Sequence, residues 1–388
     1  MVRSRTAQSL LMRSLTDTLW VVDEAKSLGF DLCGVVRVEK FAELSRMPEW
    51  LARGYAGEMK YLADPRRSDP STAMPGIRSA IVGLLNYNGE QPLSTDPAPP
   101  GDRKPSGWIS RYAWGDDYHD VLRERLEALI ESLREQFTAP FDARAYVDTG
   151  PVQERVLAKY AGLGWLGKNT LLLNQVLGSF FFLGVILTTL DLQPTLGANQ
   201  LPPPDLCGTC RRCLDACPTQ AFVEPYVMDA RKCISYLTIE LRGPIPEEFR
   251  EPMGNHLFGC DICQDVCPWN RRAPITVIPQ FQPRVFPPSK ENLTSTSLPP
   301  QNESLYLPKL EWLLGLSEAD FRELFCGSAV KRTKWRGLMR NACIALGNSS
   351  ERLGTAEHGR ISELLNRLVD SGDLVLAESA RWALSRIQ

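Results

Sequence analysis

Residues 207–218 read Cys-Gly-Thr-Cys-Arg-Arg-Cys-Leu-Asp-Ala-Cys-Pro. Four cysteines spaced C-x2-C-x2-C-x3-C and followed by proline are typical of a segment that binds [4Fe–4S] clusters. A second group, Cys260, Cys263 and Cys267, also ends in Cys-Pro, and Cys233 lies between the two groups. Two clusters require eight thiolates, and this part of the chain contains eight cysteines. The pattern therefore predicts a ferredoxin-like domain with two clusters.

The expected ligand sets follow from the way paired clusters share cysteines, because the fourth cysteine of one run ligates the other cluster. We assign one cluster to Cys207, Cys210, Cys213 and Cys267. We assign the other cluster to Cys217, Cys233, Cys260 and Cys263. Zinc is the alternative, but zinc sites prefer two C-x2-C pairs, and the three-cysteine run with its Cys-Pro end favours iron–sulfur.

Three further cysteines, Cys33, Cys326 and Cys343, stand apart from these groups. Free cysteine usually behaves as a small apolar residue, so we expect all three to be buried.

The bulk composition suits a globular chain with its own core. At 388 residues, about two or three domains are expected. The formal net charge is −2, so any contact with nucleic acid must come from a local basic patch. No apolar run reaches the ~18 residues of a membrane span. Residues 1–15 contain neither an apolar signal region nor paired arginines, so we expect a cytoplasmic protein without membrane contact.

The hydrophobic pattern predicts the main elements. Apolar residues recur with helical spacing over 119–137, and continuous apolar runs at 80–85 and 179–187 indicate buried strands. Proline-rich residues 194–204 indicate a linker, and residues 277–308 a loop.

The C-terminal part is predicted to be helical, with similar blocks at 341–346 and 379–384. Their separation is slightly below the ~40–47 residues of HEAT-type repeats, and an ordinary helical bundle remains the alternative.

The stretch Gly162-Leu-Gly-Trp-Leu-Gly-Lys-Asn-Thr170 fits G-x-G-x-x-G and nearly fits a phosphate-binding loop, although Asn169 replaces the required Ser or Thr. Both nucleotide motifs must follow a strand and open a helix. Here the residues from Pro151 onward read as a helix that begins with proline in its first turn. The glycines therefore end a helix, with Gly162 as its C-terminal cap. They form either a tight turn or a contact to a cofactor.

Several stretches together carry a family resemblance. They are 110–119 (SRYAWGDDYH), 148–155 (DTGPVQER), 162–168 (GLGWLGK), 178–184 (GSFFFLG), 224–226 (EPY) and 233–240 (CISYLTIE). In combination they resemble epoxyqueuosine reductases, and the similarity runs from about residue 20 to the C-terminus.

The resemblance implies an α+β protein in three parts. These are a cobalamin-binding α/β catalytic domain over 1–195, related to reductive dehalogenases, a ferredoxin-like two-cluster domain over 196–275, and a linker with HEAT-like α-helical repeats over 276–388 that helps to bind tRNA. The implied reaction is the last step of queuosine biosynthesis, the reduction of epoxyqueuosine to queuosine at the wobble position of tRNA. The implied partners are tRNA with epoxyqueuosine in its anticodon loop and an external low-potential electron donor of flavodoxin or ferredoxin type. We expect a monomer.

Asp148 matches the proton donor of the family. Loss of the epoxide oxygen as water needs two electrons and protons, and a low-potential cobalt can attack an epoxide carbon while the clusters recharge it. An acid working near neutral pH needs a raised pKa, which an apolar pocket can provide. From residue type alone, a helix cap is the favoured interpretation of Asp148, and the family resemblance reverses that preference.

By the same resemblance, Arg111 and Lys168 match cobalamin contacts, and Ser179 and Ser235 are further candidates. The alternatives for Arg111 and Lys168 are surface charges or salt bridges at the edge of the core. The family has a further arginine contact in the segment that contains Arg66 and Arg67 of this chain. We do not assign that contact to either residue.

The cobalamin signature D-x-H-x-x-G fails, because Leu122 stands where its glycine is required. The family binds the cofactor without that histidine, so we interpret His119 as structural.

For tRNA, residues 331–340 hold five basic side chains and one tryptophan, suited to phosphate neutralisation and base stacking. The candidate contacts are Lys331, Arg332, Lys334 and Arg336. A solvated helix face is the alternative.

Three other functions compete. The first is a cobalamin-dependent reductase of the reductive dehalogenase kind, which usually carries an export signal and lacks a helical tail. The second is a two-cluster electron-transfer module without chemistry of its own. The third is a zinc-dependent nucleic-acid binder.

Overall fold

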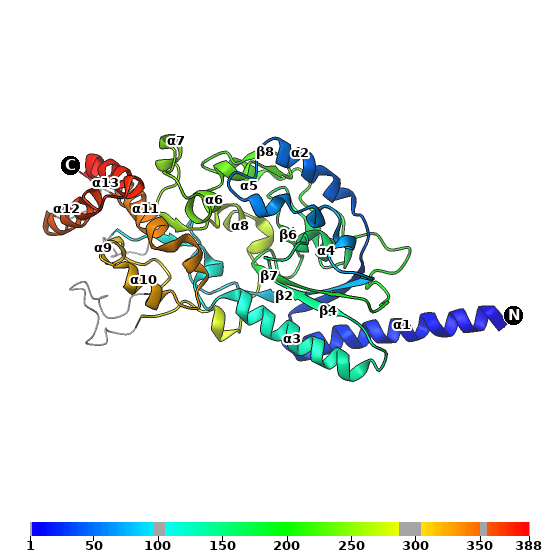
Figure 1. Ribbon diagram of the computed structural model, residues 1–388. Coiled ribbons are helices and arrows are strands. Elements are labelled where there is room, and N and C mark those ends of the chain that lie inside the picture. The colour runs from blue at the N-terminus through cyan, green and yellow to red at the C-terminus, as the bar shows by residue number, and fades with distance from the viewer. Residues whose placement is uncertain (1, 97–104, 287–303, 350–354, 388) are drawn as a thin grey trace.

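A four-stranded antiparallel sheet organises the N-terminal half of the computed structural model, which describes residues 2–96, 105–286, 304–349 and 355–387. The strand order is β1 (Leu32–Arg37), β2 (Ser79–Asn86), β7 (Phe181–Thr188) and β4 (Ala143–Tyr146). The two predicted strands are confirmed as β2 and β7, which pair over their whole length (Figure 1). All eight residues of β2 are buried, as expected for a continuous apolar run covered on both faces.

Alternate residues of these strands enter two separate cores. Ile81 and Ile186 face the core that contains α1 (Val2–Ser27) and α3 (Tyr118–Gln136). Val82 and Val185 face the core that contains α4 (Glu154–Tyr160). The predicted helix over 119–137 is confirmed as α3, and its Leu122, Leu126, Leu129 and Leu133 are buried. The N-terminal part of α1 projects away from the sheet (Figure 1).

The glycine-rich stretch forms a tight turn between a helix and a strand, which is the first of the two alternatives given above. Helix α4 ends at Tyr160, and Gly162 follows with φ of +83°. The chain then enters β5 (Trp165–Leu166), which pairs with β6 (Leu172–Leu173). A Cβ at Gly164 would lie 2.1 Å from the carbonyl oxygen of Leu173, so this turn requires glycine. The prediction that Pro151 occupies the first turn of α4 was wrong, because the helix begins three residues later at Glu154.

The cysteine-rich segment consists of short elements connected by loops. They are α5 (Arg212–Asp215), β8 (Phe222–Glu224), β9 (Val227–Met228), α6 (Ile234–Ile239), α7 (Glu247–Arg250), β10 (His256–Phe258) and α8 (Ile262–Asp265). Strand β10 pairs in parallel with β3 (Trp108–Ile109), which lies just before α3. The segment is therefore tied to the chain that leads into the N-terminal sheet.

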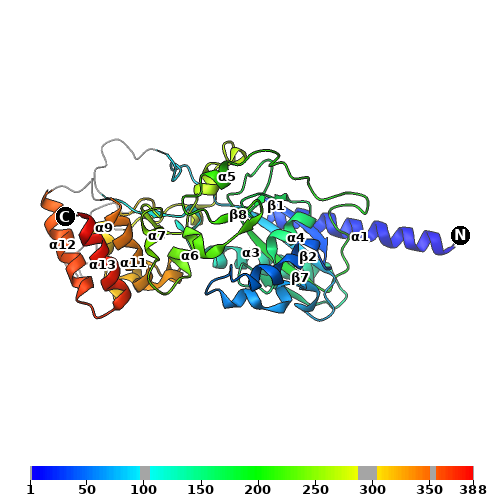
Figure 2. The ribbon, with the colours of Figure 1, turned by 90° about the horizontal axis from the view of Figure 1, so that it is seen from above.

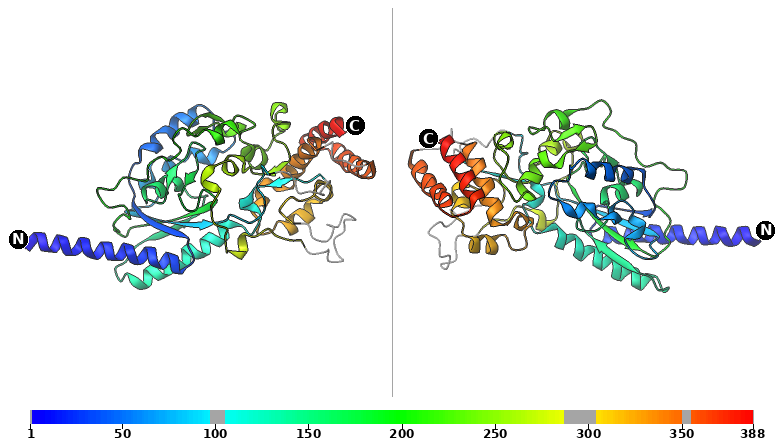
Figure 3. Two further views of the ribbon diagram at one scale, coloured as in Figure 1. Left: turned by 180° about the vertical axis from the view of Figure 1, so that it is seen from behind. Right: turned by 45° about the horizontal axis from the view of Figure 1, so that its top comes forward.

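The C-terminal part is helical, as predicted. Its helices are α9 (Leu310–Leu314), α10 (Glu318–Leu324), α11 (Lys334–Gly347), α12 (Thr355–Val369) and α13 (Leu374–Ile387). The two similar sequence blocks lie in α11 and α13, which pack against each other. Gly347 permits close approach, since a Cβ there would lie 2.5 Å from the Trp382 ring. The views in Figures 2 and 3 place these helices at one end of the molecule and α1 at the other.

The C-terminal helices share one core with residues from earlier in the chain. Trp108, Trp114 and Phe258 are buried together with Leu338 and Leu346. The short helix α2 (Met47–Ala52) lies in the segment that covers the opposite side of the sheet. Within the described ranges, we find no helix with both the length and the apolar character needed to cross a membrane.

The three isolated cysteines divide differently from the prediction. Cys33 and Cys343 are buried, as expected, but Cys326 is exposed. Cys326 lies in the turn that follows α10, where its backbone N–H bonds to Glu323 and its side chain has no core to enter.

Candidate active site

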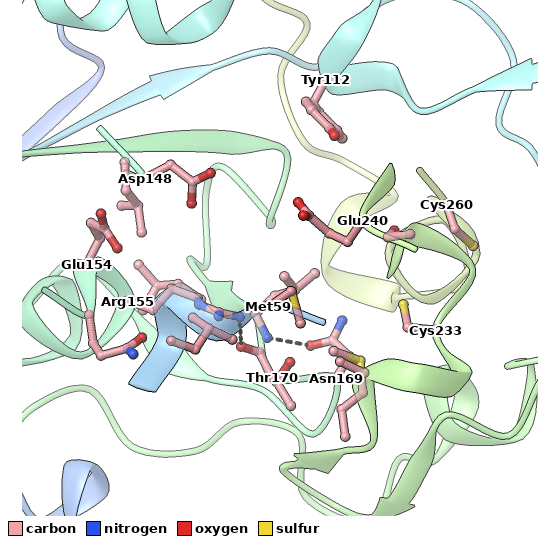
Figure 4. Close-up of a pocket in the computed structure, with 18 of the residues that line it drawn as sticks. Met59, Tyr112, Asp148, Glu154, Arg155, Asn169, Thr170, Cys233, Glu240 and Cys260 are labelled. Atoms are coloured by element: carbon pink, nitrogen blue, oxygen red, sulfur yellow. Dashed lines mark hydrogen bonds between the residues drawn. The ribbon is translucent and has the colours of Figure 1, made fainter. Parts of the chain in front are cut away.

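A cavity of about 1300 Å³ lies between the N-terminal sheet and the cysteine-rich segment (Figure 4). Its walls come from 59–67, 148–155, 169–172, 179–183 and 217–235, together with a few residues beyond them. Pockets for small ligands usually measure about 300–1,000 Å³. The cavity therefore has room for an unusually large ligand, or for two ligands together.

Asp148 stands at one wall of this cavity, two residues after β4. Its backbone has φ of +56°, a left-handed conformation that aspartate tolerates better than most residues. Tyr118 donates its hydroxyl hydrogen to Oδ2 of Asp148 at 3.0 Å. The N-terminal cap of α4 is Gln153, five residues further on, so the alternative in which Asp148 caps this helix is wrong.

Two neighbouring residues, Glu154 and Arg155, also line the cavity, and sequence reasoning did not single them out. Arg155 donates from Nη1 to the carbonyl oxygen of Thr170 at 2.6 Å. Glu154 Oε1 is buried and has no hydrogen-bond partner in the described part of the chain. Burial, followed by the nearby Asp148 charge, raises the pKa of Glu154 to about 7. Both residues lie in the stretch 148–155, which carries part of the family resemblance. That resemblance was the signal in the sequence by which they could have been found.

The eight clustered cysteine thiols fall into two neighbouring groups. Burial, then the proximity of Cys267, Cys207 and Cys210, raises the pKa of Cys213 to about 11. These four residues are the first predicted ligand set, and we call them the outer group.

Burial, then Cys233 and Cys263, likewise raises the pKa of Cys260. For Cys263, burial acts together with Cys233, Cys213 and Cys217. We call Cys217, Cys233, Cys260 and Cys263 the inner group. The two groups are neighbours, because Cys213 of the outer group lies near Cys263 of the inner group.

Only the inner group reaches the cavity. Its four cysteines all line the wall, whereas no cysteine of the outer group does so among the described residues. In Figure 4, Cys233 and Cys260 lie across the cavity from Asp148 and Glu154. No three His, Cys, Asp or Glu side chains of the described ranges stand close enough to hold a single metal ion. A cluster of several irons spreads its ligands more widely than one ion.

Comparison with known proteins now agrees with this arrangement. Residues 206–270 match the family described as 4Fe-4S double cluster binding domain, and residues 67–149 match Epoxyqueuosine reductase QueG, DUF1730. The epoxyqueuosine reductase of Gloeobacter violaceus is 45% identical over 343 residues, which cover 87% of this chain and 98% of that protein. This chain belongs to the epoxyqueuosine reductase family.

Solved structures of the family have the same mixed α/β fold. A crystal structure of epoxyqueuosine reductase with an epoxyqueuosine-modified tRNA-Tyr stem loop has a TM-score of 0.79 and 30% identity, covering 95% of this chain and 89% of that chain. The Bacillus subtilis enzyme, whose catalytic aspartate loop was found swung out of the active site, has a TM-score of 0.77 and 28% identity, with coverage of 95% and 89%.

The predicted cofactor contacts of this reductase divide into two kinds. Ser179 and Ser235 line the cavity, and so do Arg66 and Arg67. Arg111 and Lys168 do not line it, judged on the described residues.

Arg111 is 1% exposed and donates to the carbonyl oxygens of Gly89, Gln91 and Pro92. Lys168 donates to the carbonyl oxygens of Gly208 and Cys210 at the outer group. Both cations therefore hold loops in place in this structure.

The basic stretch of the family member is largely engaged in ion pairs. Lys331 contacts Asp117 at 2.8 Å, Arg332 contacts Glu240 at 2.6 Å, and Arg336 contacts Asp373. Trp335 is half-buried and donates to the carbonyl oxygen of Leu316, so its ring is part of the core rather than a free stacking surface. Lys334 is exposed, and Arg332 lines the cavity.

Replacing Glu154 with glutamine tests its unusual environment. The pKa of Glu154 rises from 4.5 to about 7 on folding, so the unfolded chain loses this proton first and wild-type stability falls as the pH rises through that window. We expect Glu154→Gln to be more stable than wild type by about 1–2 kcal/mol at a pH of about 8, with the difference vanishing near pH 4. Anaerobic urea denaturation at both pH values measures this. Glu224→Gln, at an exposed position on β8, is the control, and an equal effect of Glu154→Gln at both pH values would contradict the interpretation.

Proposed function

We propose that this chain reduces epoxyqueuosine in the anticodon loop of tRNA to queuosine, with cobalamin and two [4Fe–4S] clusters. The observation that carries the proposal is the position of one cavity between Asp148 and the four thiols of the inner group. A relative of this chain binds an epoxyqueuosine-modified stem loop, which supports the same substrate here.

The residues of the cavity fit cobalamin. The corrin is a large flat ring with amide groups at its rim, and the cavity offers a volume of about 1300 Å³. Phe181, Phe182 and Ile234 supply apolar surface, while Ser179 and Ser235 supply hydroxyl groups. The buried Glu154 Oε1 and Arg67 Nε lack partners within the described ranges, as expected of groups that await a polar ligand. When bound, cobalamin supplies a low-potential cobalt nucleophile for the epoxide carbon.

The thiols supply the route for electrons. We assign one cluster to the outer group and the other to the inner group, because the thiols gather in these two sets. The outer group would hold the cluster that an external low-potential donor of flavodoxin or ferredoxin type reduces, and the inner group would hold the cluster that supplies single electrons at the cavity. Burial raises the pKa of the free thiols, so binding of iron must displace their protons.

Asp148 supplies the proton on the opposite side. The reaction converts an epoxide, two electrons and two protons into an alkene and water. The carboxylic acid of Asp148 gives its proton to the oxygen that leaves carbon, and the Tyr118 hydroxyl orients that acid. Asp148 lies on the loop between β4 and α4, and the catalytic loop of the Bacillus subtilis relative has been seen swung out of its active site.

We assign one of these functions to each of three domains. Residues 1–195 form the cobalamin-binding part, 196–275 the two-cluster part and 276–388 the linker and HEAT-like helices that help to bind tRNA. Arg332 belongs to the last part and lines the cavity, which supports a contact with the bound anticodon loop.

Replacement of Asp148 tests the acid. Reduced protein with cobalamin is incubated with tRNA that contains epoxyqueuosine, and the nucleosides are analysed by mass. Asp148→Asn keeps the shape but holds no acidic proton, so we expect turnover to fall by about 10²–10⁴-fold. Asp23→Asn on α1, 76% exposed, should match wild type. Normal turnover of the Asp148 variant would exclude this role.

Removal of one thiol tests the ligand sets. Cys217→Ser should lose the inner cluster, so the iron content should fall to about half. Cys326→Ser, which replaces the exposed isolated cysteine, should keep all its iron. Iron and sulfide analysis with electron paramagnetic resonance of the reduced protein measures both. A full complement of iron in Cys217→Ser would contradict the assignment.

A charge reversal at Lys334 tests the tRNA surface. Lys334 is exposed at the start of α11, so Lys334→Glu should weaken tRNA binding and lower the slope of log Kd against log salt by about 1. Lys26→Glu is the matched control, since α1 lies at the opposite end of the molecule. Binding is measured at several salt concentrations, and an unchanged slope would remove Lys334 from the interface.

A further inference from the structure

The proposed reaction consumes two protons in each turnover, but Asp148 holds only one. Its carboxylate must therefore regain a proton while the substrate is bound, and again before the next turnover. The Asp148 side chain is 69% exposed, and the cavity provides access to it. Once cofactor and anticodon loop fill that cavity, this access is closed. Protons then need another route, and the structure contains a suitable group behind Asp148. This reasoning rests on the proposed function.

His119 lies directly behind Asp148 on the first turn of α3. Its Nδ1 is 2.7 Å from Oδ1 of Asp117, and its Nε2 is 3.8 Å from Oδ2 of Asp148. The His119 side chain is 23% exposed and lies outside the residues that line the cavity among those described. It therefore faces the acid on one side and keeps contact with solvent.

Asp117 fixes the orientation of the His119 ring. Asp117 is 3% exposed, and burial alone would raise its pKa, but hydrogen bonds from His119 and Lys331 hold the pKa well below its usual range. Asp117 is therefore an anion that accepts a hydrogen bond from Nδ1. Since Nδ1 is occupied, Nε2 is the nitrogen that faces Asp148.

Tyr118 also touches Asp148, but it is not suited to carry protons. Burial, followed by the Asp148 charge, raises its pKa well above the usual value, so the phenol keeps its proton at neutral pH. Its ring stacks on Phe182 at 4.3 Å and on His119 at 4.1 Å, which holds the imidazole in place. Among the described residues, the charged or titratable groups in contact with the imidazole are Asp117, Asp148 and Tyr118, with Lys331 behind Asp117.

We propose that His119 returns protons to Asp148 during turnover. After Asp148 has given its proton to the substrate oxygen, the imidazolium of His119 passes the Nε2 proton to the Asp148 carboxylate. Nδ1 keeps its proton on Asp117, so Nε2 is the nitrogen that then takes a proton from solvent, across the 3.8 Å gap that separates it from Asp148, and no other reactant is required. The gap of 3.8 Å closes to hydrogen-bond distance with a movement of about 1 Å. Because His119 acts through Asp148, it is a positioning residue with a proton-supplying role.

The test uses the complete protein with clusters and cobalamin. His119→Asn places an amide where Nδ1 now binds Asp117, but it cannot carry a proton. We expect kcat to fall by about 10–100-fold with an unchanged KM for tRNA. The rate of the variant should keep rising as the pH falls, since its protons come from solvent, whereas wild type reaches a plateau. His358→Asn is the matched control, because His358 binds Ile387 in the C-terminal helices. His119→Gln replaces the first variant if that one fails to fold.

A second readout does not depend on turnover. The chain has three histidines, so the imidazole signals of isotope-labelled protein can be resolved by NMR. Asp148→Asn should shift the titration midpoint of His119 and leave His256 and His358 unchanged. Wild type that forms no queuosine would overturn the proposed function itself. Active wild type together with a His119→Asn variant of equal kcat and pH profile, or a His119 midpoint insensitive to Asp148→Asn, would overturn only the proton return.

Discussion

One buried carboxylate fastens the inner group of thiols to the wall of the cavity. Asp261 lies between Cys260 and Cys263 and is 1% exposed. It accepts hydrogen bonds from the Trp108 indole at 3.1 Å, from the backbone N–H of Arg111 at 2.7 Å and from the Ser110 hydroxyl. Each of these donors would cost roughly 1–3 kcal/mol if left buried without a partner. The loop that carries two inner thiols is therefore held against the segment that leads into α3, which in turn carries Tyr118 and His119.

This connection places the inner thiols and Asp148 on different sides of one cavity. The inner thiols reach the cavity from the cysteine-rich segment, while Asp148 reaches it from the loop after β4. Helix α3 starts between these two supports, with its first turn against Asp148 and its buried face against the sheet. The separation of the inner thiols from Asp148 therefore depends on the loop after β4 as well as on α3. In the proposed function, the contact of Tyr118 with Asp148 would help to hold that loop in the geometry that the reaction needs.

Local patterns in the sequence predicted much of the fold and part of the site. The cysteine spacing predicts two ligand sets because each run is one tight loop, and Cys213 does lie near Cys267, Cys207 and Cys210. The division into two ligand sets stays a prediction. The helical periodicity over 119–137 predicted α3, and the two apolar runs predicted β2 and β7. These elements could be predicted because their pattern of buried residues is visible in a short stretch of sequence. Family resemblance pointed to Asp148. The residues that surround Asp148 come from three separate segments of the chain, so local patterns did not predict them.

The direction of individual side chains was the feature that the sequence predicted least well. Arg111 is buried and donates to the carbonyl oxygens of a neighbouring loop, because a buried cation needs acceptors. Lys168 is partly buried and donates to the Cys210 carbonyl oxygen, and a cobalamin contact of either residue stays a prediction. Glu154 and Arg155 face the cavity because α4 begins later than its proline suggested. Cys326 is exposed because a turn replaces the expected buried environment. None of these orientations follows from composition or periodicity.

The ion pairs of the basic stretch bear on how an acidic chain recognises tRNA. The formal net charge is −2, so long-range attraction to a polyanion is weak. Arg332 is held by Glu240 at the edge of the cavity, and Lys331 by the buried Asp117. A phosphate that binds either cation must compete with a carboxylate already in place, so general affinity for nucleic acid is reduced. A ligand that also fills the cavity gains contacts that other RNA lacks, and this difference favours an anticodon loop of matching shape. Because Lys331 and His119 share Asp117, tRNA that draws Lys331 away would leave the carboxylate to the imidazole alone. In the proposed mechanism, recognition at the surface would thereby be connected to the proton supply of Asp148.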